Sequence, residues 1–587
     1  MRNEGWLSTP GARRITRRRA LGLAGAGVSL SPFALAACGG SSSSGSNARA
    51  GGSAGSAGAG TPSTGAGSPA LGASGTAAAA SKPPQYPYAF QLPDETAAAV
   101  PGGTYRDYFF ADITGTLDPN TTASRSSVLW LTDQVYERLL RFDTGSGKDP
   151  TKPLQVIPHL AASFEVPSDG SQYIFKLRPG VKFWNVAPVN GREMDMDDWK
   201  LSLAASVASS YVPSAALIFD LKNPQFPDAQ TMVLKTNFPY APGPGLFTSG
   251  PSSFYVMPKE GFGGGSLDFK NTVLGTGYNQ FVSYQPSISY EFKKHDSYWQ
   301  AGRPFIDKKH TPVIPEYANQ MAQFVTGNIL IFQPNQTDVL QARKDAAGAV
   351  LERAPNAGGL TVSYFGFQEL DTAPWKDPRV RQAISMVIDR KSRLDYFTNA
   401  SEFQQNGLPI ATKLNTHFSG GSYFWQDAQT GQLGDASIYL QYNVAEAKKL
   451  LAAAGFPDGI DIDCYAHTGL NYGPQYPESA QIMVDMMTMS GLFRVNFHKI
   501  PYADWLPTIY QTRNYKGLAM AHPGFGGNGD NDISLWSSYH TASGQQFRGI
   551  KDSQLEMMID NQRRELDPDK RTGLMHDIQK YLAQTMP

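Results

Sequence analysis

The first 84 residues of this 587-residue chain are unsuited to a packed core, so any folded body must be built from the residues that follow. Residues 39–84 consist almost entirely of Gly, Ser, Ala, Thr and Pro, with one arginine and one lysine. Such a segment buries too little apolar area to offset the entropy that it would lose on ordering. We therefore expect a disordered linker over residues 39–84 and folded structure from about residue 99 onward.

An export signal precedes this linker. Five arginines between residues 13 and 19 are followed by Ala20–Ala37, which is uncharged and broken by Gly and Pro, as in a signal peptide. The run TRRRALG fits the twin-arginine export pattern, with Ala20 where Phe is usual, so the general export route stays open. The run LAAC ending at Cys38 resembles a bacterial lipobox. Residues 1–38 are therefore predicted to direct export, with Cys38 lipidated and the body anchored at the outer face of the cell membrane; an ordinary cleaved signal is the alternative.

The charge balance argues against a nucleic-acid-binding protein. The chain has 51 basic and 51 acidic residues, and residues 1–37 hold six arginines and one glutamate, which leaves 45 against 50 in the remainder. A net charge of about −5 is the wrong sign for binding a phosphate backbone. Two cysteines exclude a disulfide framework and a four-cysteine zinc site. Cys464, without a partner, is expected to be a buried or free thiol.

Strand and helix patterns alternate along the body, which predicts a mixed α/β fold. Alternating apolar residues on both sides of Ser168–Gly170 predict a β-hairpin. Helices are predicted after Asp377, Asn443 and Asp567, each of which is a good N-cap residue. The last of these is expected to bury Leu574, Ile578, Tyr581 and Leu582.

No known catalytic pattern is found. The part of the chain after the linker lacks a Gly-x-Ser-x-Gly elbow, and the whole chain lacks a His-Glu-x-x-His pair, a Walker loop and a Cys-x-x-Cys pair. Gly275-Thr276-Gly277 is only a fragment of a nucleotide-binding loop and is expected to form a turn or a strand crossing. The nine histidines are scattered, and each is expected to be an ordinary surface or core residue. We expect no catalytic residues, no resident metal and no cofactor.

Ten blocks in fixed order resemble the extracellular solute-binding proteins of family 5, which serve bacterial ABC importers for oligopeptides, dipeptides and nickel. They are LDP (117–119), VYERLLRFD (135–143), IPHLAASFEV (157–166), YIFKLRPGVKFW (173–184), GREMDMDDW (191–199), GTGY (275–278), DSYWQAGRPFID (296–307), PWKDPRVRQAISMVIDR (374–390), AEAKKLLAAAGFPDG (445–459) and LDPDKRTGLMHDIQKYL (566–582). We interpret these blocks mainly as scaffold. The arginines of Arg379–Arg390 are expected to form structural ion pairs, and Trp184 to be a packed aromatic residue.

The resemblance implies an α/β, two-lobed clamshell with an extra subdomain in the first lobe. Lobe I would comprise residues 99–150, 271–368 and 563–587, the extra subdomain residues 151–270, and lobe II residues 369–562. Ligand contacts with both lobes would stabilise the closed state. Family members continue past the last predicted helix into a further strand, so a chain with downstream residues is expected to be more stable than one that ends at Pro587.

The implied function is capture of an extracellular solute, an oligopeptide or dipeptide, for delivery to the permease and ATPase subunits of an ABC importer. No covalent chemistry is needed, and a monomer is expected. A sugar, an opine or a metal chelate is the alternative ligand, and a ligand sensor for a membrane receptor is the alternative role. A secreted hydrolase is disfavoured because no catalytic constellation is visible.

The resemblance also suggests where ligand contacts lie. In oligopeptide-binding relatives, ligand contacts come from the segment just after the LDP block and from the second lobe. Carried over to this chain, the predicted contacts are Ala123, Ser124, Arg125, Trp505, Arg513, His522, Phe525, Asp530, Asp532 and Trp536. Peptide-binding relatives place an aspartate near Phe525 that pairs with the peptide ammonium group. Here Gly526–Gly529 stands in that place, with Asp530 and Asp532 after it, which argues against a free amino terminus as the recognised group.

Overall fold

The computed structural model describes residues 96–586 with several gaps, so the predicted signal peptide, Cys38 and the linker lie outside the described residues. The gaps are residues 111, 114–115, 122–124, 145–154, 210–217, 249–253, 347, 352–363, 368–372, 409, 411, 470–474, 511, 522–529 and 544–550.

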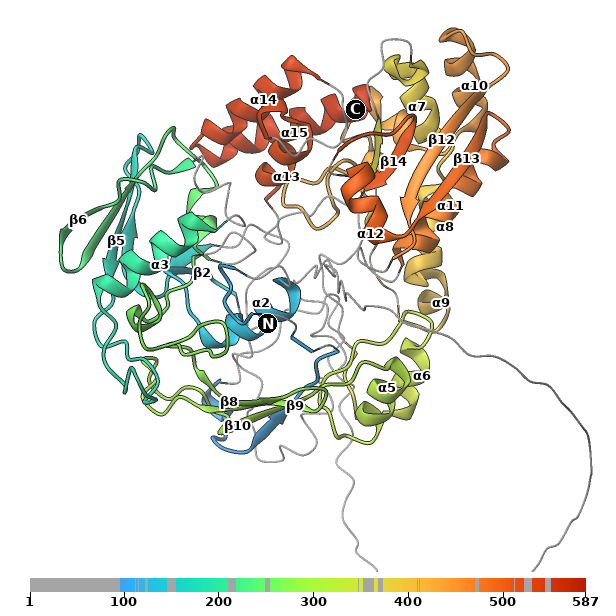
Figure 1. Cartoon of the computed structure of the whole chain (residues 1–587). Coiled ribbons are helices and arrows are strands. Elements are labelled where there is room, and N and C mark those ends of the chain that lie inside the picture. Colours follow the sequence, from blue (N-terminus) through green and yellow to red (C-terminus); the bar gives the residue numbers. More distant parts are fainter. Residues whose placement is uncertain are drawn as a thin grey trace, which may run out of the picture. The chain divides into compact units, whose positions relative to one another are not determined.

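The described strands form four sheets (Figure 1). One has the order β1 (Thr104–Arg106), β10 (Lys308–Pro312), β9 (Ser289–Lys294), β8 (Asn279–Gln285). A second has the order β4 (Ala161–Glu165), β5 (Gln172–Leu177), β7 (Thr231–Lys235), β6 (Gln225–Asp228). A third has the order β11 (Tyr364–Phe367), β14 (Leu518–Ala521), β12 (Ile460–His467), β13 (Phe493–Ile500). The fourth pairs β2 (Leu140–Phe142) with β3 (Val156–Pro158).

Helices are interspersed with these strands, as expected for the α/β class. The α-helices are α2 (Arg125–Val135), α3 (Met196–Ala208), α5 (Tyr317–Val325), α6 (Val339–Asp345), α7 (Pro378–Met386), α8 (Arg390–Thr398), α9 (Ala400–Gln405), α10 (Val444–Ala453), α11 (Tyr476–Met489), α12 (Tyr502–Trp505), α13 (Asp532–Tyr539), α14 (Ser553–Arg564) and α15 (Pro568–Thr585). Shorter 3-10 helices occur at Thr96–Ala98, Gly243–Phe247, Lys259–Gly261, Pro374–Lys376, Ala428–Thr430, Gly434–Leu440 and Thr541–Ser543, and a π-helical turn at Leu506–Tyr510.

The predicted hairpin and helix starts are confirmed. Strands β4 and β5 pair antiparallel across the turn at Ser168–Gly170. The side chains of Asp377, Asn443 and Asp567 accept hydrogen bonds from backbone N–H groups in the first turns of α7, α10 and α15. In α15, however, Met575 takes the buried position and Leu574 is half-buried, so the expected stripe is shifted by one residue there. A cap is decided by neighbouring backbone groups, whereas the buried stripe depends on what packs against the helix.

The arginines of Arg379–Arg390 are structural, but only partly through the ion pairs that we expected. Arg379 pairs with Asp377 at 2.5 Å. The buried Arg381 instead donates to the backbone carbonyl oxygens of Thr585 and Met586 at 2.8 Å. Carbonyls at the end of a helix lack partners within the helix. Arg381 therefore caps α15 and ties it to α7.

Two separate hydrophobic cores contain most of the buried apolar side chains. The larger runs from Phe109 to Val313 and includes residues of the predicted extra subdomain together with predicted lobe I residues. The second runs from Trp375 to Met520, inside predicted lobe II. Helix α15 packs in smaller cores with residues 418–440 and 535–559. The domain boundaries stay a prediction, and residues 563–587 have most of their packing partners outside the larger core.

The Gly275–Gly277 segment is a backbone crossing. The N–H of Gly277 donates to the carbonyl of Val135 at 2.9 Å, and a Cβ added to Gly275 would lie 2.1 Å from that same oxygen. The indole Nε1 of Trp184 donates to the carbonyl of Gly277 at 2.8 Å, and Trp184 is buried. Glycine is needed here because two backbones touch. The structure thus confirms both the crossing and the packed aromatic residue.

A buried carboxylate joins four of the sequence blocks in the larger core. Glu137, 7% exposed, lies 2.9 Å from His159 Nε2 and accepts hydrogen bonds from Tyr298 Oη at 2.8 Å and Trp299 Nε1 at 3.2 Å. The guanidinium of Arg178 stacks 4.6 Å from the centre of the Trp299 ring and donates to the carbonyl of His159 at 2.6 Å. Segments more than 160 residues apart in the chain therefore meet at one side chain.

These partners keep Glu137 ionised. Burial by itself raises the pKa of a carboxyl, but the His159 charge and the hydrogen bonds from His159 and Tyr298 outweigh it and lower the pKa of Glu137 below its ordinary value of 4.5. A buried, hydrogen-bonded carboxylate stabilises the fold only while all partners are present. We call Glu137, His159, Arg178, Tyr298 and Trp299 the Glu137 network.

We expect Glu137→Gln to lower the free energy of unfolding by about 2–4 kcal/mol, because His159, Tyr298 and Trp299 would lose an ionised acceptor inside the core. The measurement is urea unfolding followed by fluorescence. Glu165→Gln is the matched control, because Glu165 is exposed on β4; it should change stability by less than about 0.5 kcal/mol. Equal stability of the two variants would contradict a structural role for the network.

Candidate functional site

The third sheet has the strand order that creates a binding site at its carboxyl edge. Strand β12 pairs parallel with β13 on one side and with β14 on the other. The chain leaves β12 for β13 on one side and then crosses to β14 on the other, so the connections diverge at β12. In open α/β sheets, ligands bind outside the carboxyl ends of strands at such a point. The candidate site is therefore the edge marked by His467, Ile500 and Ala521, beside α12 in Figure 1.

Aromatic rings gather around His467 at this edge. The ring of Tyr476 stacks on His467 with centroids 4.2 Å apart, and those of Tyr502 and Trp505 meet it edge-on at 4.9 and 5.1 Å. Tyr510 lies 5.2 Å from Trp505. Offset and edge-on contacts of this kind are the favourable arrangements for aromatic pairs. We call these five residues the aromatic edge cluster; sequence analysis had identified only Trp505 among them.

Sequence analysis missed the rest because each is an ordinary aromatic residue in its own segment. His467 ends β12, Tyr476 begins α11, and Tyr502 and Tyr510 flank the helix after β13. A usable signal exists in hindsight for His467, Tyr476 and Tyr502, since each lies at the carboxyl end of a strand or at the start of the helix that follows it. That signal needs the parallel pairing of β12 and β13, which the sequence does not show.

Burial dominates the electrostatics of this cluster. His467 is 2% exposed, and loss of hydration lowers its pKa from 6.5 to about 4. The imidazole is therefore neutral at pH 7 and acts as a flat, polarisable ring. Burial also raises the pKa of Tyr510, with the charge of Arg513 opposing that effect. The structure thus brings two predicted site residues, Trp505 and Arg513, to the same cluster.

Three other predicted site residues lie in a different cluster. Asp532 is 1% exposed and accepts hydrogen bonds from Tyr240 Oη at 2.6 Å and Gln562 Nε2 at 2.5 Å. Arg563 Nε lies 3.1 Å from the same carboxylate. A carboxylate with these partners links α13 and α14 to residue 240 of the larger core.

Asp530 and Trp536 are engaged in the same region. Arg571 of α15 binds Asp530 with two bonds, at 2.6 and 2.8 Å. The guanidinium of Arg563 lies 5.1 Å from the centre of the Trp536 ring, and the ring of His540 stacks on Trp536 with centroids 5.8 Å apart. The two-bond pairing of Arg571 with Asp530 is among the stronger and more specific kinds of ion pair. Ligand contact by Asp530, Asp532 and Trp536 stays a prediction, and in the described conformation their polar and ring surfaces are used by the protein itself.

The remaining predicted site residues are only partly described. Arg125 is the first residue of α2, but its side chain lies outside the described residues. Ala123, Ser124, His522 and Phe525 also lie outside them. Their roles stay predictions.

No metal centre or membrane helix is found in the described part of the chain. No group of three or more His, Cys, Asp or Glu side chains there is placed to hold a metal ion. None of the helices in the described ranges is long and apolar enough to cross a bilayer. Cys464 is fully buried in the second core, and burial raises the pKa of its thiol well above the ordinary value.

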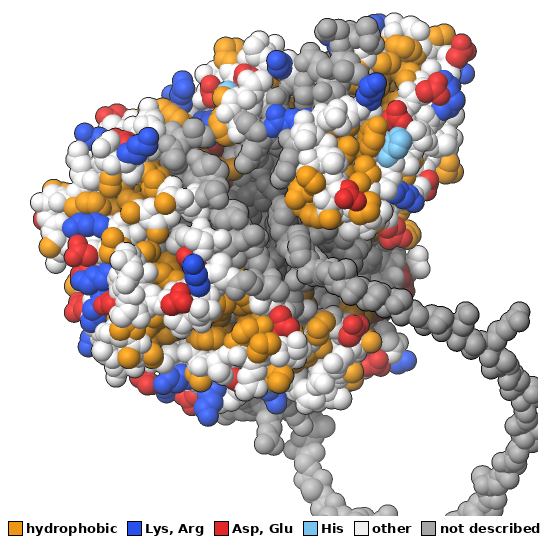
Figure 2. Space-filling view, in the orientation of Figure 1, with side chains coloured by type: hydrophobic (Ala, Val, Ile, Leu, Met, Phe, Trp, Pro, Cys, Tyr) orange, Lys and Arg blue, Asp and Glu red, His pale blue; other side chains and the backbone are white. Residues whose placement is uncertain are grey.

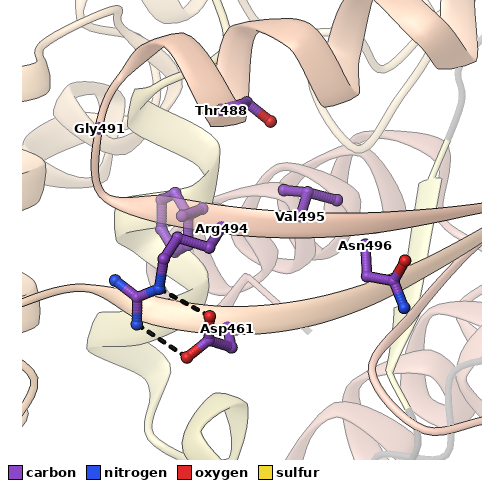
Figure 3. Close-up of a pocket in the computed structure, with 7 residues that line it drawn as sticks. Asp461, Thr488, Gly491, Arg494, Val495 and Asn496 are labelled. Atoms are coloured by element: carbon purple, nitrogen blue, oxygen red, sulfur yellow. Dashed lines mark hydrogen bonds and ion pairs between the residues drawn. The ribbon is translucent and has the colours of Figure 1, made fainter.

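A surface pocket lies at the opposite end of β13 from the aromatic edge cluster. Its walls include Gly491, Asn496 and the ion pair between Arg494 and Asp461, whose two bonds measure 2.6 and 2.8 Å (Figure 3). The side chains of this pair are 55% and 78% exposed, and surface pairs of this kind contribute little to stability. Residues 494 and 500 are separated by about 20 Å of strand at 3.3 Å per residue. The pocket is therefore separate from the candidate site.

Comparison with known proteins identifies similar chains. Residues 155–546 match the family described as bacterial extracellular solute-binding proteins, family 5 Middle. Heme-binding protein A of Haemophilus influenzae is 27% identical over 421 residues, covering 68% of this chain and 69% of its own. Di/tripeptide-binding protein 1 of Pseudomonas aeruginosa is 24% identical over 480 residues, covering 78% and 82%.

A solved structure shows the same fold. The ABC transporter-associated periplasmic binding protein DppA from Helicobacter pylori, in complex with the peptide STSA, superposes with a TM-score of 0.60 at 19% identity. The match covers 83% of this chain and 91% of that chain. The predicted fold class, an α/β two-lobed binding protein, is thereby confirmed.

We expect His467 to make the fold sensitive to acid. Its pKa is about 4 in the folded state and 6.5 in the unfolded state, so only the unfolded chain takes up a proton as pH falls from 6.5 to 4. This contribution to stability is complete above pH 6.5 and is lost towards pH 4, by up to about 3 kcal/mol. His467→Phe should remove that part of the pH slope, measured as the free energy of unfolding at pH 7.5 and 4.5.

The matched control is Tyr476→Phe, which alters the ring stacked on His467 but removes no group that titrates in this range. Its difference from the unaltered protein should be the same at both pH values. A His467→Phe difference that is also constant with pH would show that His467 does not carry the effect.

Proposed function

Because the chain belongs to the bacterial extracellular solute-binding proteins of family 5, we propose that it captures a short peptide outside the cell and delivers it to the permease of an ABC importer. The family resemblance predicted from the ten blocks is thereby confirmed. The observation that carries the choice of a peptide is the alignment with di/tripeptide-binding protein 1, which extends over 78% of this chain.

The aromatic edge cluster supports capture of a short ligand. Binding sites for small molecules are mostly apolar, with a few polar groups that orient the ligand. Trp505 and Tyr510 supply apolar ring surface, and Arg513, whose charge acts on Tyr510, supplies a positive group for a peptide carboxylate. Asp530 is bound by Arg571 and Asp532 by Tyr240 and Gln562. Recognition of the carboxyl end therefore fits this site better than recognition of an ammonium group.

Binding and release would proceed without covalent chemistry. The family to which the chain belongs consists of solute-binding proteins. The buried, neutral His467 is also unsuited to act as a general base at pH 7, because its pKa is about 4. A ligand that contacts both lobes stabilises the closed form by its differential affinity, and the permease would recognise that form.

The amino-terminal residues would place this binding protein at the membrane. Residues 1–38 carry the export signal and Cys38 the lipid anchor, while residues 39–84 form the tether. Membership of an extracellular family supports export. The anchored body would act as a monomer at the outer face of the cell membrane.

The direct test is native mass spectrometry of the full chain purified without denaturation, followed by unfolding and identification of the released mass. A series of short peptides would support the proposal. A released tetrapyrrole would instead favour the class named for heme-binding protein A, and a single sugar or chelate mass would also overturn the choice of peptide.

We expect Arg513→Gln to weaken binding of a released dipeptide or tripeptide roughly 10- to 100-fold, the effect of losing a charge-assisted hydrogen bond. Calorimetric titration should show that the unaltered protein prefers the free carboxylate over the carboxamide form of the same peptide, and that Arg513→Gln loses this preference. Arg494→Gln is the control, because Arg494 lies at the separate surface pocket. An undiminished preference in Arg513→Gln would exclude the carboxylate role.

A further inference from the structure

The outward face of the first sheet carries basic side chains from three neighbouring strands. Along β1, β10 and β9, side chains alternate between the core and solvent, as the two-residue period of a strand requires. Tyr105, Phe292 and Thr311 point into the core. The outward positions are those of opposite parity, and they include Arg106, Lys308, His310 and Lys293. We call these four residues the basic face.

The strand register places these basic residues directly beside one another. Lys308 is the partner of Lys293 across the antiparallel β9–β10 pair, and Arg106 is the partner of His310 across the parallel β1–β10 pair. Side chains that are directly opposite across an antiparallel pair lie about 5 Å apart, and like charges at such positions repel. The two exposed lysines therefore form an unfavourable pair in the isolated protein.

Acidic residues nearby are engaged with other groups. Glu291 lies 2.6 Å from His310 Nδ1, and it also accepts a hydrogen bond from the hydroxyl of Ser289 at 2.6 Å. Asp307 pairs with Lys294 at 2.8 Å, and the charge of Lys308 adds a smaller effect that also lowers the pKa of Asp307. Within the described residues, no ion pair involves Arg106, Lys293 or Lys308, although Arg106 donates to the carbonyl of Gly327 at 3.1 Å. The basic face thus keeps an excess of positive charge.

Other features of the same sheet suit a broad anionic surface. The charges are spread over three neighbouring strands spaced about 4.8 Å apart, so they are distributed across the sheet and not gathered at one point. Val282 and Ile288 on β8 and the β8–β9 turn are 55% and 60% exposed. In Figure 2, Lys and Arg side chains lie along the lower rim, interspersed with Asp and Glu, where β8, β9 and β10 are found in Figure 1.

The chain connectivity brings this face to a membrane. Strand β1 is the first described strand after the predicted tether, and Arg106 is ten residues beyond the first described residue. If Cys38 carries the lipid, as the proposed function has it, the tether of residues 39–84 ends about 20 residues before the strand that bears Arg106. Each Lys or Arg close to an anionic bilayer contributes modestly, and several together orient a tethered body.

We propose that the basic face, Arg106, Lys293, Lys308 and His310, docks on the anionic phospholipid headgroups of the membrane to which the protein is tethered. Phosphate groups between Lys293 and Lys308 would relieve the repulsion that their register creates. Docking would turn a flexible tether into a defined orientation of the first sheet toward the bilayer. This surface is separate from the aromatic edge cluster and needs no solute.

The test measures sedimentation of the full chain with lipid vesicles, in a Cys38→Ala background so that no acyl chain contributes. Vesicles contain phosphatidylcholine alone or with about 30% phosphatidylglycerol. We expect binding only to the anionic vesicles, weakening as salt screens the charges. Lys293→Gln/Lys308→Gln should bind roughly 10- to 30-fold more weakly, because each charge near the surface contributes a factor of about five.

Lys222→Gln/Lys448→Gln is the matched control, because it removes two exposed lysines remote in sequence from the basic face. It should bind within about twofold of the parent, and the arginines of residues 1–37 contribute equally to every variant. Melting curves should show that both double variants are folded. Equal losses in the two double variants would overturn the proposal, as would the absence of any preference for anionic vesicles. Because no solute is present, this outcome is independent of peptide binding.

Discussion

The larger half of this protein depends on one buried carboxylate. Glu137 stands where segments from four parts of the chain converge, and its oxygen atoms accept from His159, Tyr298 and Trp299. A charge inside a core is tolerated only when every lone pair has a partner. The residues that surround Glu137 must therefore arrive together, which couples the hairpin β4–β5 to the segment after β9. Four of the ten ordered blocks of the sequence contribute residues to this network.

The smaller half follows a different principle, in which strand order decides where a ligand can bind. Because β12 lies between β13 and β14, the connections from β12 run to opposite sides of it, which is the strand order at which ligands bind in open α/β sheets. The rings at that edge come from β12, the start of α11 and the helical residues 502–510, and they surround a histidine that burial keeps neutral. A site of this kind offers apolar surface and orientation, which suits a protein that must bind and then release its ligand unchanged.

Charged residues near the candidate site divide into two groups by their partners. Arg513 stays close to the aromatic edge cluster, whereas Asp530 and Asp532 hold α13 against α14 and α15. In the sequence analysis, residue type and position along the chain had made Arg513, Asp530 and Asp532 equally good candidates for ligand contact. Arg571, Gln562 and Tyr240, each remote in sequence from the predicted site, bind Asp530 or Asp532 and so connect these two carboxylates to α14, α15 and the larger core.

The sequence by itself determined what depends on near neighbours and on composition. The hairpin at Ser168–Gly170, the caps at Asp377 and Asn443 and the family blocks were all predicted correctly, because each is encoded within about a dozen residues. Only the tertiary structure decided which ring meets His467, that Arg381 caps a distant helix, and that Lys293 lies opposite Lys308. These contacts join residues that a linear pattern cannot pair, because strand register and helix packing arise only when the whole core closes.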